Sequence, residues 1–276
     1  MTETALRRPH SLRQLAVLGA VAALGVVLLV GLGAWQVERL GWKLGLIAAI
    51  DARVEAAPVA PPGPKAWPAV TGDADEYRRV TATGHYLNGD EALVEAVTAK
   101  GAGFWVMTPF VTDAGFTVLV NRGFVPADRR NPAARPQGQI AGPTSVTGLL
   151  RISEPGGGFL RGNDPAHDRW YSRDVAAIAQ AHGLSAAPYF IDADATGNPG
   201  GLPVGGLTVI DLPNNHLVYA LTWFVLAAML AAGAIYVGIG EWRLRHARQA
   251  PSNPQGAAPA RSGRAPPESL AHHRRA

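Results

Sequence analysis

Hydrophobic residues form two long stretches, one near each end of the chain. Residues 14–37 and 212–240 contain no Asp, Glu, Lys or Arg. A helix needs about 20 apolar residues to cross a bilayer, so each stretch is long enough to span one with margin for tilt. The alternative is a cleaved signal peptide and a buried core helix, but a signal peptide has a shorter apolar region that ends in a cleavage site. We therefore predict transmembrane helices at 14–36 and 212–239.

The pattern changes between the two stretches. Leu46, Ile47, Ile50 and Val54 recur at helical spacing, which predicts a helical stalk to about Val54. The Pro-rich segment 57–68 breaks this pattern and is expected to be a linker. Short runs rich in β-branched and aromatic residues follow, each bounded by Gly, Asp, Asn or Pro, and they predict strands at 78–87, 91–97, 104–112, 116–125, 144–152 and 187–194.

Turn and cap signals complete the middle region. Asp113 to Gly115 separate two strand runs and predict a hairpin, so we expect an antiparallel sheet. One amphipathic helix is expected at 173–182, with Ser172 as its N-cap and Gly183 at its end. The predicted fold is a membrane-anchored α+β protein, in which two transmembrane helices flank a mainly antiparallel β domain at 37–211 with one or two helices.

The charges divide along the same boundaries. Residues 1–13 hold three basic residues and one acidic residue, and residues 241–276 hold seven and two, whereas residues 38–211 hold 15 and 18. Because Lys and Arg favour the cytoplasmic side, we expect both termini in the cytoplasm and the middle domain exported. The net charge of +4 thus reflects topology and not a nucleic-acid-binding face. The tail at 240–276 is expected to be basic and disordered.

The absence of cysteine limits which metal ligands, cofactor attachments and cross-links the protein can have. It excludes disulfides, thiolate metal sites and covalent c-type haem attachment, so a metal or cofactor must use His, Met or carboxylate ligands. Catalytic and phosphate-binding motifs are absent from the sequence. Most histidines lie in the basic tails or stand alone, and we expect these to be solvated or structural: His10, His85, His167, His182, His246, His272 and His273.

His216 is the exception because of its place. It occupies the first turn of the second apolar stretch, with Pro213 before it and Asn214 or Asn215 as N-cap. Tyr219 at i+3 and Trp223 at i+7 lie on the same helical face. One nitrogen ligand above an aromatic surface suits a flat macrocycle such as haem. The other interpretation, an interfacial histidine among belt aromatics, stays open on these residues alone.

Several motifs then resemble one family. They are GAWQVERLGWK at 33–43, YRRVTATGHY at 77–86, GFWVMTPF at 103–110, VLVNRGFVP at 118–126, WYSRDVAAIA at 170–179 and GGLTVIDLPNNHLVYALTWF at 205–224. In this order they resemble the Surfeit locus protein 1 family of cytochrome c oxidase assembly factors. The family has the same two-helix topology, and its members are implied to act at or near insertion of haem a into subunit I.

The resemblance also implies site residues. Bacterial members are thought to bind haem a through the histidine that matches His216, with Asn214, Asn215, Tyr219 and Trp223 matching around it. Phe124 stands where Trp is common in the family, and it retains an aromatic packing role. Arg122 is a further candidate, because an exported arginine could pair with a haem propionate or a partner carboxylate. A structural role, bridging a turn carbonyl or the internal carboxylates Asp113 or Asp128, is its other interpretation, and Gly123 is expected to serve a turn.

These observations lead to two hypotheses about the function of the protein. The leading hypothesis is a non-enzymatic assembly factor for aa3-type oxidase that binds haem a transiently through His216 and passes it to subunit I. The alternative is a cofactor-free scaffold that stabilises an oxidase intermediate. Expected partners are subunit I, the lipid bilayer and a haem A synthase, with homo-oligomerisation left open. The short N-terminus lacks a mitochondrial transit pattern, which favours a bacterial inner membrane and a periplasmic middle domain.

Overall fold

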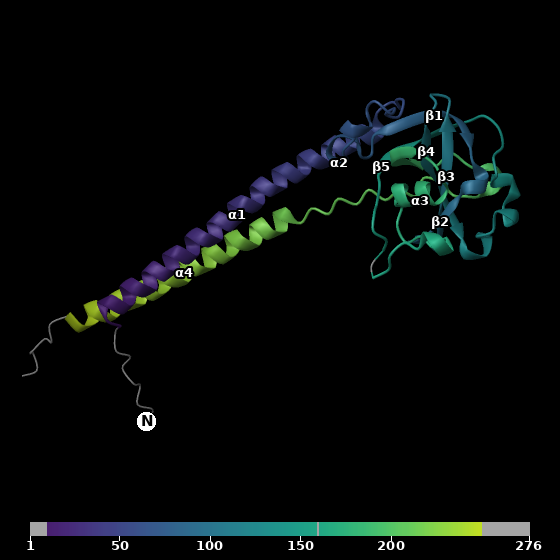
Figure 1. The fold of residues 1–276 in the computed structure, drawn as a ribbon. Coiled ribbons are helices and arrows are strands. Elements are labelled where there is room, and N and C mark those ends of the chain that lie inside the picture. Colours follow the sequence, from purple (N-terminus) through teal and green to yellow (C-terminus); the bar gives the residue numbers. More distant parts are fainter. Residues whose placement is uncertain (1–9, 159, 250–276) are drawn as a thin grey trace, which may run out of the picture. The chain divides into compact units, whose positions relative to one another are not determined.

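The computed structural model describes residues 10–158 and 160–249. Two long helices, α1 (Leu12–Glu55) and α4 (His216–Gln249), each contain an 18-residue window apolar enough to cross a membrane. They are candidate membrane spans, and the segment of the sequence between them forms a β-rich domain, drawn in teal and green in Figure 1. α1 continues without a break to Glu55, which confirms the predicted helical stalk.

α4 differs from the prediction at its far end. The helix continues to Gln249, so residues 240–249 are helical where we expected the start of a disordered tail. No glycine or proline interrupts 241–249, and the first proline beyond it is Pro251. The helix therefore has no sequence signal to end earlier. The rest of the predicted tail, 250–276, lies outside the described residues.

The first of two compact units comprises the chain up to Gln36 and from Val218 onward. Within it α1 and α4 pack side by side in opposite directions (Figure 1). A Cβ on Gly33 would lie 2.6 Å from the Phe224 ring, and one on Gly25 would lie 2.8 Å from Leu230. The missing side chains of these glycines let the two helices approach closely, as small residues do in membrane helix pairs.

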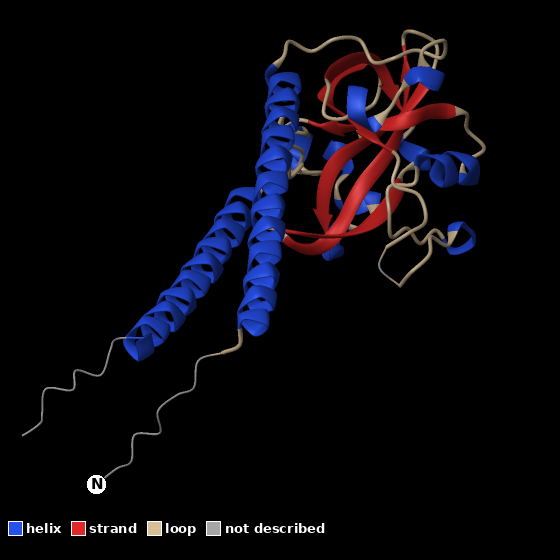
Figure 2. Cartoon of the chain, turned by 90° about the vertical axis from the view of Figure 1, so that its left-hand side faces the viewer, coloured by secondary structure: helices blue, strands red, loops and turns tan. Residues whose placement is uncertain are grey.

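The second unit, Val37–Leu217, contains a six-stranded sheet. All six predicted strands form: β1 (Arg79–Tyr86), β2 (Ala92–Thr98), β3 (Gly101–Thr112), β4 (Thr117–Pro126), β5 (Thr144–Ile152) and β6 (Ala186–Ala193). Their order is β1-β5-β6-β4-β3-β2. β2 pairs with the first part of β3, and β1 pairs with its last residues, so the sheet closes on itself as the curled red strands of Figure 2 show.

One pairing departs from the antiparallel sheet that the hairpin signals predict. β4 and β6 are parallel neighbours, while the other pairs are antiparallel. The chain leaves β4, forms β5 and the short helix α3 (Val175–Ala181), and returns beside β4 in the same direction. Short turns can join only antiparallel strands, whereas a long connection also permits parallel pairing. The parallel pair could therefore not be predicted from local turn residues.

β4 is buried on both faces, and its side chains alternate between two apolar clusters. Val118 and Val120 pack inside the barrel with Phe110, Leu150 and Tyr189. Leu119 points to the opposite face, where it joins a cluster under α3 that consists of Ala92, Val94, Met107, Trp170, Val175, Ile178 and Phe190. Polar side chains on β4 are therefore buried whichever way they point.

α3 is shorter than the predicted helix and has a different N-cap. Asp174 Oδ1, and not Ser172, accepts from the third backbone N–H, that of Ala177, at 3.1 Å. The Ser172 hydroxyl instead accepts from Gly157 N and Asn163 Nδ2. Gly183, with φ of +65°, follows the helix as predicted. The remaining short elements are α2 (Gly72–Asp75), η1 (Trp67–Ala69), η2 (Asn88–Asp90), η3 (Ala127–Arg129), η4 (Pro132–Ala134), η5 (Pro136–Gly138), η6 (Pro165–His167) and η7 (Pro199–Gly201).

The segments that flank the barrel pack against it. In the Pro-rich segment expected to be a linker, the carbonyl of Pro62 accepts from Trp67 Nε1 at 3.0 Å and from the Tyr189 hydroxyl at 2.6 Å. On the return toward α4, Val204 exchanges two backbone hydrogen bonds with Phe124 of β4. The barrel thus fixes part of both connecting segments.

Candidate functional site

His216 is the first residue of α4 and so lies in its first turn, as predicted, but residues 212–215 of the predicted helix are not helical. The side chain of Asn214 accepts a hydrogen bond from the His216 backbone N–H at 3.4 Å, which identifies Asn214 as the residue whose side chain covers the start of the helix. The His216 side chain is half-buried. Its imidazole therefore lies at the boundary between the β-domain return segment and the apolar helix.

Tyr219 and Trp223 lie on adjoining sides of α4. Ala220, Trp223 and Ala227 form a buried or half-buried stripe along the helix, and His216 continues this stripe one turn earlier. Tyr219 is 53% exposed and lies beside the stripe. The predicted face thus contains His216 and Trp223 on one side and a largely exposed phenol on the other.

Two of the histidines expected to be solvated have specific partners. His10 donates its backbone N–H to Glu241 at 3.1 Å, and its ring lies 3.8 Å from the same carboxylate. His246 Nδ1 lies 2.9 Å from the Trp242 carbonyl. In the β domain His167 pairs with Asp164 and His182 lies near Asp90. Over the described residues no three His, Cys, Asp or Glu side chains gather as a metal site; His272 and His273 lie outside them.

Arg122 is buried at one end of the barrel, on the β4 face of Val118 and Val120, and is only 1% exposed. Its guanidinium lies 4.4 Å from the Tyr86 ring centre and donates to the Gly138 carbonyl in η5. Its contacts to Asn88 Oδ1 and Asn198 Oδ1 are long, at 3.4 Å each. Within the described part of the chain Nε has no hydrogen-bond acceptor. We call Tyr86, Asn88, Arg122, Gly138 and Asn198 the Arg122 cluster.

This geometry partly matches the structural role considered for Arg122. Of the two alternatives, the turn carbonyl is the one found, that of Gly138. The other, an internal carboxylate such as Asp113 or Asp128, is not: Asp128 pairs with Arg129 at 3.6 Å. Gly123 also serves a different purpose from a turn. It has φ of +126°, and a Cβ would lie 2.1 Å from the Val204 carbonyl oxygen, so glycine admits the return segment beside β4. Phe124 keeps the expected aromatic packing, edge to face with Trp105.

The Arg122 cluster carries excess positive charge. Burial lowers the pKa of Arg122, opposed by Tyr86 and Glu91 and reinforced by Arg135. Burial likewise raises the pKa of Tyr86 to about 12. The neighbouring carboxylate of Glu91 already forms a two-point ion pair with Arg135, whose side chain is 1% exposed. Two buried guanidiniums therefore share one buried carboxylate.

The opposite face of β4 carries a balanced arrangement, the Asp192 network of Asn121, Arg151, Arg173, Asp192 and Thr208. Asp192, 3% exposed, accepts from Asn121 Nδ2 at 2.8 Å, Arg151 at 3.0 Å, Arg173 at 3.2 Å and Thr208 at 3.1 Å. Glu76 and Glu154 pair with the far sides of the two arginines. Burial lowers the pKa of Arg173, but its hydrogen bond to Glu154 and the charge of Asp192 outweigh burial and raise it.

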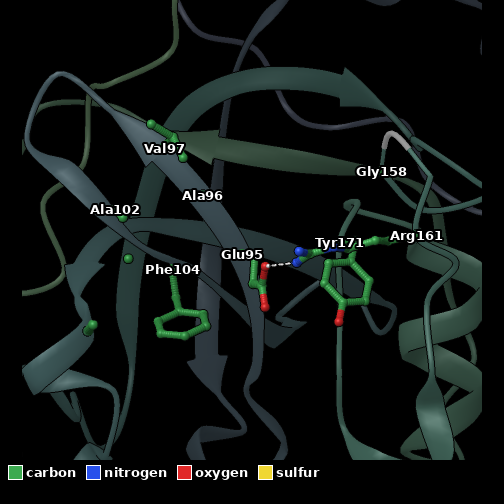
Figure 3. Close-up of a pocket in the computed structure, with 10 residues that line it drawn as sticks. Glu95, Ala96, Val97, Ala102, Phe104, Gly158, Arg161 and Tyr171 are labelled. Carbon is green, nitrogen blue, oxygen red and sulfur yellow. Dashed lines mark hydrogen bonds and ion pairs between the residues drawn. The ribbon is translucent and has the colours of Figure 1, made fainter.

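Two hollows in the β domain differ in what lines them. One, of about 460 Å³, is lined by Arg122 and Tyr86 together with the polar side chains of Thr144, Ser145, Thr147 and Asn198. The other, of about 510 Å³, lies beside the β2–β3 hairpin and brings together Phe104, Tyr171 and the exposed Glu95–Arg161 ion pair of 3.3 Å (Figure 3). The second hollow contains none of the residues that the sequence singled out.

Sequence reasoning missed most members of both polar groups. Glu91, Asn198, Arg135 and Asp192 lie outside any motif, and Tyr86 ends the run YRRVTATGHY without a predicted role. Each acts through a partner far along the chain. The available signal was the pair Asn121–Arg122 in the otherwise apolar run VLVNRGFV, since polar residues in a doubly buried strand need partners.

In the sequence, a closed β barrel is flanked by two candidate membrane helices, and a histidine begins the second. This arrangement fits the class of membrane-anchored proteins. The model of the SURF1 family matches residues 23–228. The chain belongs to this family, which supports a role in cytochrome c oxidase assembly and is not a known class of enzymes.

Individual relatives agree with this membership. Surfeit locus protein 1 of Rattus norvegicus is 39% identical over 214 residues, covering 72% of this chain and 68% of the relative. The human protein of the same name is 40% identical over 217 residues, with 72% and 70% covered. A SURF1-like protein of Monosiga brevicollis is 37% identical over 224 residues, with 75% and 82% covered. The family match covers the barrel and part of each candidate span.

Proposed function

We propose that the protein binds haem a and assists its insertion into subunit I of an aa3-type cytochrome c oxidase. Family membership supports the assembly role, and the observation that carries the haem assignment is His216 at the first position of α4. When bound, haem a would supply the redox centre that the oxidase requires. The chain's own part is to hold and release the group, so it needs no bond-making residues.

The residues around His216 fit such a group. An imidazole nitrogen provides one axial ligand, and the exposed ring of Tyr219 and the half-buried indole of Trp223 offer flat surfaces within about 11 Å along the same helix. A single axial ligand gives modest affinity. This favours transfer to a site with more ligands, as a change in equilibrium rather than a catalysed reaction.

The setting that goes with this proposal is a bacterial inner membrane. The basic tails would lie in the cytoplasm and the β domain in the periplasm, because Lys and Arg concentrate outside the two candidate spans. Subunit I would be the direct partner, and a haem A synthase would be the source of the cofactor. Arg122 would contribute only if its buried guanidinium reaches a propionate.

The test is the visible spectrum of the full-length protein purified from a host that makes haem a. We expect His216→Ala to lose most of the haem, whereas the matched control His85→Ala, at an exposed position of β1, retains it. An unchanged haem content and band position in His216→Ala would rule out ligation by His216.

The scaffold alternative makes a separate prediction. A cofactor-free scaffold co-purifies with subunit I in a host that cannot make haem a, at the level seen in the normal host. A complex that forms only when haem a is made supports the haem proposal instead.

A further inference from the structure

The Arg122 cluster combines three features that seldom occur together in a purely structural arginine. The guanidinium is almost completely buried, no carboxylate in the described residues forms an ion pair with it, and its Nε has no acceptor there. A buried charge that lacks a counter-ion is costly, and proteins usually pair it or neutralise it. Other buried arginines of the domain obey this rule, since Arg135 pairs with Glu91 and Arg173 pairs with Glu154 and Asp192.

The surroundings of Arg122 offer a place for the missing charge. The hollow of about 460 Å³ reaches Arg122 and is also lined by Thr144, Ser145 and Thr147 of β5 and by Asn198. The Thr147 hydroxyl lies 3.0 Å from the Thr81 hydroxyl. Tyr86 stacks on the guanidinium and adds a further hydroxyl to the lining. Hydroxyl donors beside an arginine are groups that bind carboxylates and phosphates. The amide of Asn198 is not such a donor here, because its Nδ2 already donates to the Pro203 carbonyl at 2.6 Å.

Negative groups already near the hollow do not satisfy Arg122. Asp194 lines the hollow, but its Oδ1 accepts from the Thr196 N–H at 3.0 Å and it forms no ion pair with Arg122. Glu91 is bound on both oxygens by Arg135. The two side-chain amides that contact Arg122 do so at 3.4 Å, so an oxyanion could replace the Asn198 contact at little loss.

We propose that the hollow beside Arg122 is a binding site for an oxyanion, a carboxylate or phosphate group with a single negative charge, and that Arg122 is its cationic anchor. One negative charge balances the two guanidiniums of Arg122 and Arg135 against Glu91. The oxyanion has two possible sources, a small anion in solution or a propionate of haem. The site does not require ligation of haem by His216, and only the propionate source rests on the proposed function.

The test uses the full-length protein in detergent, with inorganic phosphate and acetate as probes at constant ionic strength. Thermal unfolding of the β domain is followed by tryptophan fluorescence. We expect a saturable rise in Tm with phosphate or acetate in the native protein, since a ligand that binds only the folded state raises Tm. Arg122→Gln should lose this rise, whereas Arg161→Gln, which removes an exposed arginine paired with Glu95, should keep it.

A second variant covers the case in which Arg122→Gln fails to fold. Ser145 is an exposed residue of β5 that lines the hollow, so Ser145→Glu supplies a carboxylate from the chain itself. We expect a higher Tm without added anion and a smaller shift with phosphate. A phosphate response that is absent in the native protein, or equal in the native protein and Ser145→Glu, overturns the proposal.

The source of the anion is decided by competition. If haem removes the phosphate-dependent shift and haem dimethyl ester does not, the site takes a propionate. If neither competes while phosphate still binds, it takes a free anion. Loss of haem in His216→Ala with no phosphate response anywhere would refute the oxyanion site and leave the haem proposal intact.

Discussion

Asn121 and Arg122 are neighbours on β4, yet their side chains enter opposite buried surroundings. Asn121 joins the Asp192 network, in which each guanidinium contacts at least two carboxylates. Arg122 enters the Arg122 cluster, which contains no carboxylate, and the neighbouring carboxylate of Glu91 is engaged by Arg135. The electrostatic result is opposite: the pKa of Arg173 is raised despite burial, whereas burial lowers the pKa of Arg122. One strand thus separates a balanced structural network from an unbalanced cluster.

The difference suggests different roles for the two groups. The Asp192 network ties β4, β5 and the return segment together through Asn121, Arg151 and Thr208. Since its charges satisfy one another, it needs nothing from outside the domain. In the Arg122 cluster the guanidinium charge has no counter-ion, and a hollow lies beside it. The stability of this cluster therefore depends on whether an anion occupies the hollow.

Among the variants that test this difference, Asp192→Ala should lower the free energy of unfolding the most. It removes the shared acceptor of four donors and leaves two buried guanidiniums with less compensation, which costs about 3 to 5 kcal/mol. Urea unfolding of the full-length protein measures the loss. Asp194→Ala is the matched control, because Asp194 is half-buried and accepts only the Thr196 N–H. Equal losses in the two variants would show that the network contributes no special stability.

Arg122→Met should cost less, about 1 to 3 kcal/mol. The Gly138 carbonyl loses its donor, but an uncompensated buried charge disappears as well, and the second change offsets part of the first. Arg135→Met is the matched comparison, because it leaves Glu91 buried without its partner and should destabilise more. If urea unfolding in anion-free buffer shows a greater loss of stability for Arg122→Met than for Arg135→Met, then Arg122 is not an uncompensated charge.

The sequence alone predicts most helices and strands, but it does not predict the Arg122 cluster or the Asp192 network. Six strands, the β3–β4 hairpin and the start of α4 at His216 were predictable because apolar runs, Gly115 and Asn214 act locally. The parallel pairing of β4 and β6 was not, because it depends on a connection of some sixty residues between them. The N-cap of α3 also depended on tertiary contacts, since the Ser172 hydroxyl is used by Gly157 and Asn163.

The candidate site shows the same division. His216, Tyr219 and Trp223 follow from helical spacing on one segment, although spacing did not reveal that Tyr219 is the exposed member. Arg122 was recognisable as a buried polar residue in an apolar strand, but its partners Gly138 and Asn198 lie 16 and 76 residues away. Long-range partners of this kind decide whether an arginine is satisfied, and no local pattern encodes them.

Thr208→Val tests how the Asp192 network holds the return segment. The change removes one hydrogen bond to a charged acceptor that keeps its other donors, so the expected cost is about 1 kcal/mol. Amide hydrogen exchange should rise locally at Gly206, whose N–H donates to the Ala193 carbonyl at 3.0 Å. Thr196→Val, at an exposed position, is the control and should leave this exchange unchanged. Global unfolding without a local effect at Gly206 would contradict the tethering role.

Tyr86→Phe is the mildest change and tests the Arg122 cluster through pH. Burial raises the pKa of Tyr86 to about 12, above the unfolded value of about 10. A group whose pKa rises on folding adds stability that is complete below the unfolded pKa and is lost as pH rises through the folded pKa. Native protein should therefore lose stability relative to Tyr86→Phe between about pH 10 and 12, while the two differ little at about pH 8. Urea unfolding across this range measures the difference, and parallel pH profiles for the two proteins would mean that the phenol beside Arg122 titrates like one in water.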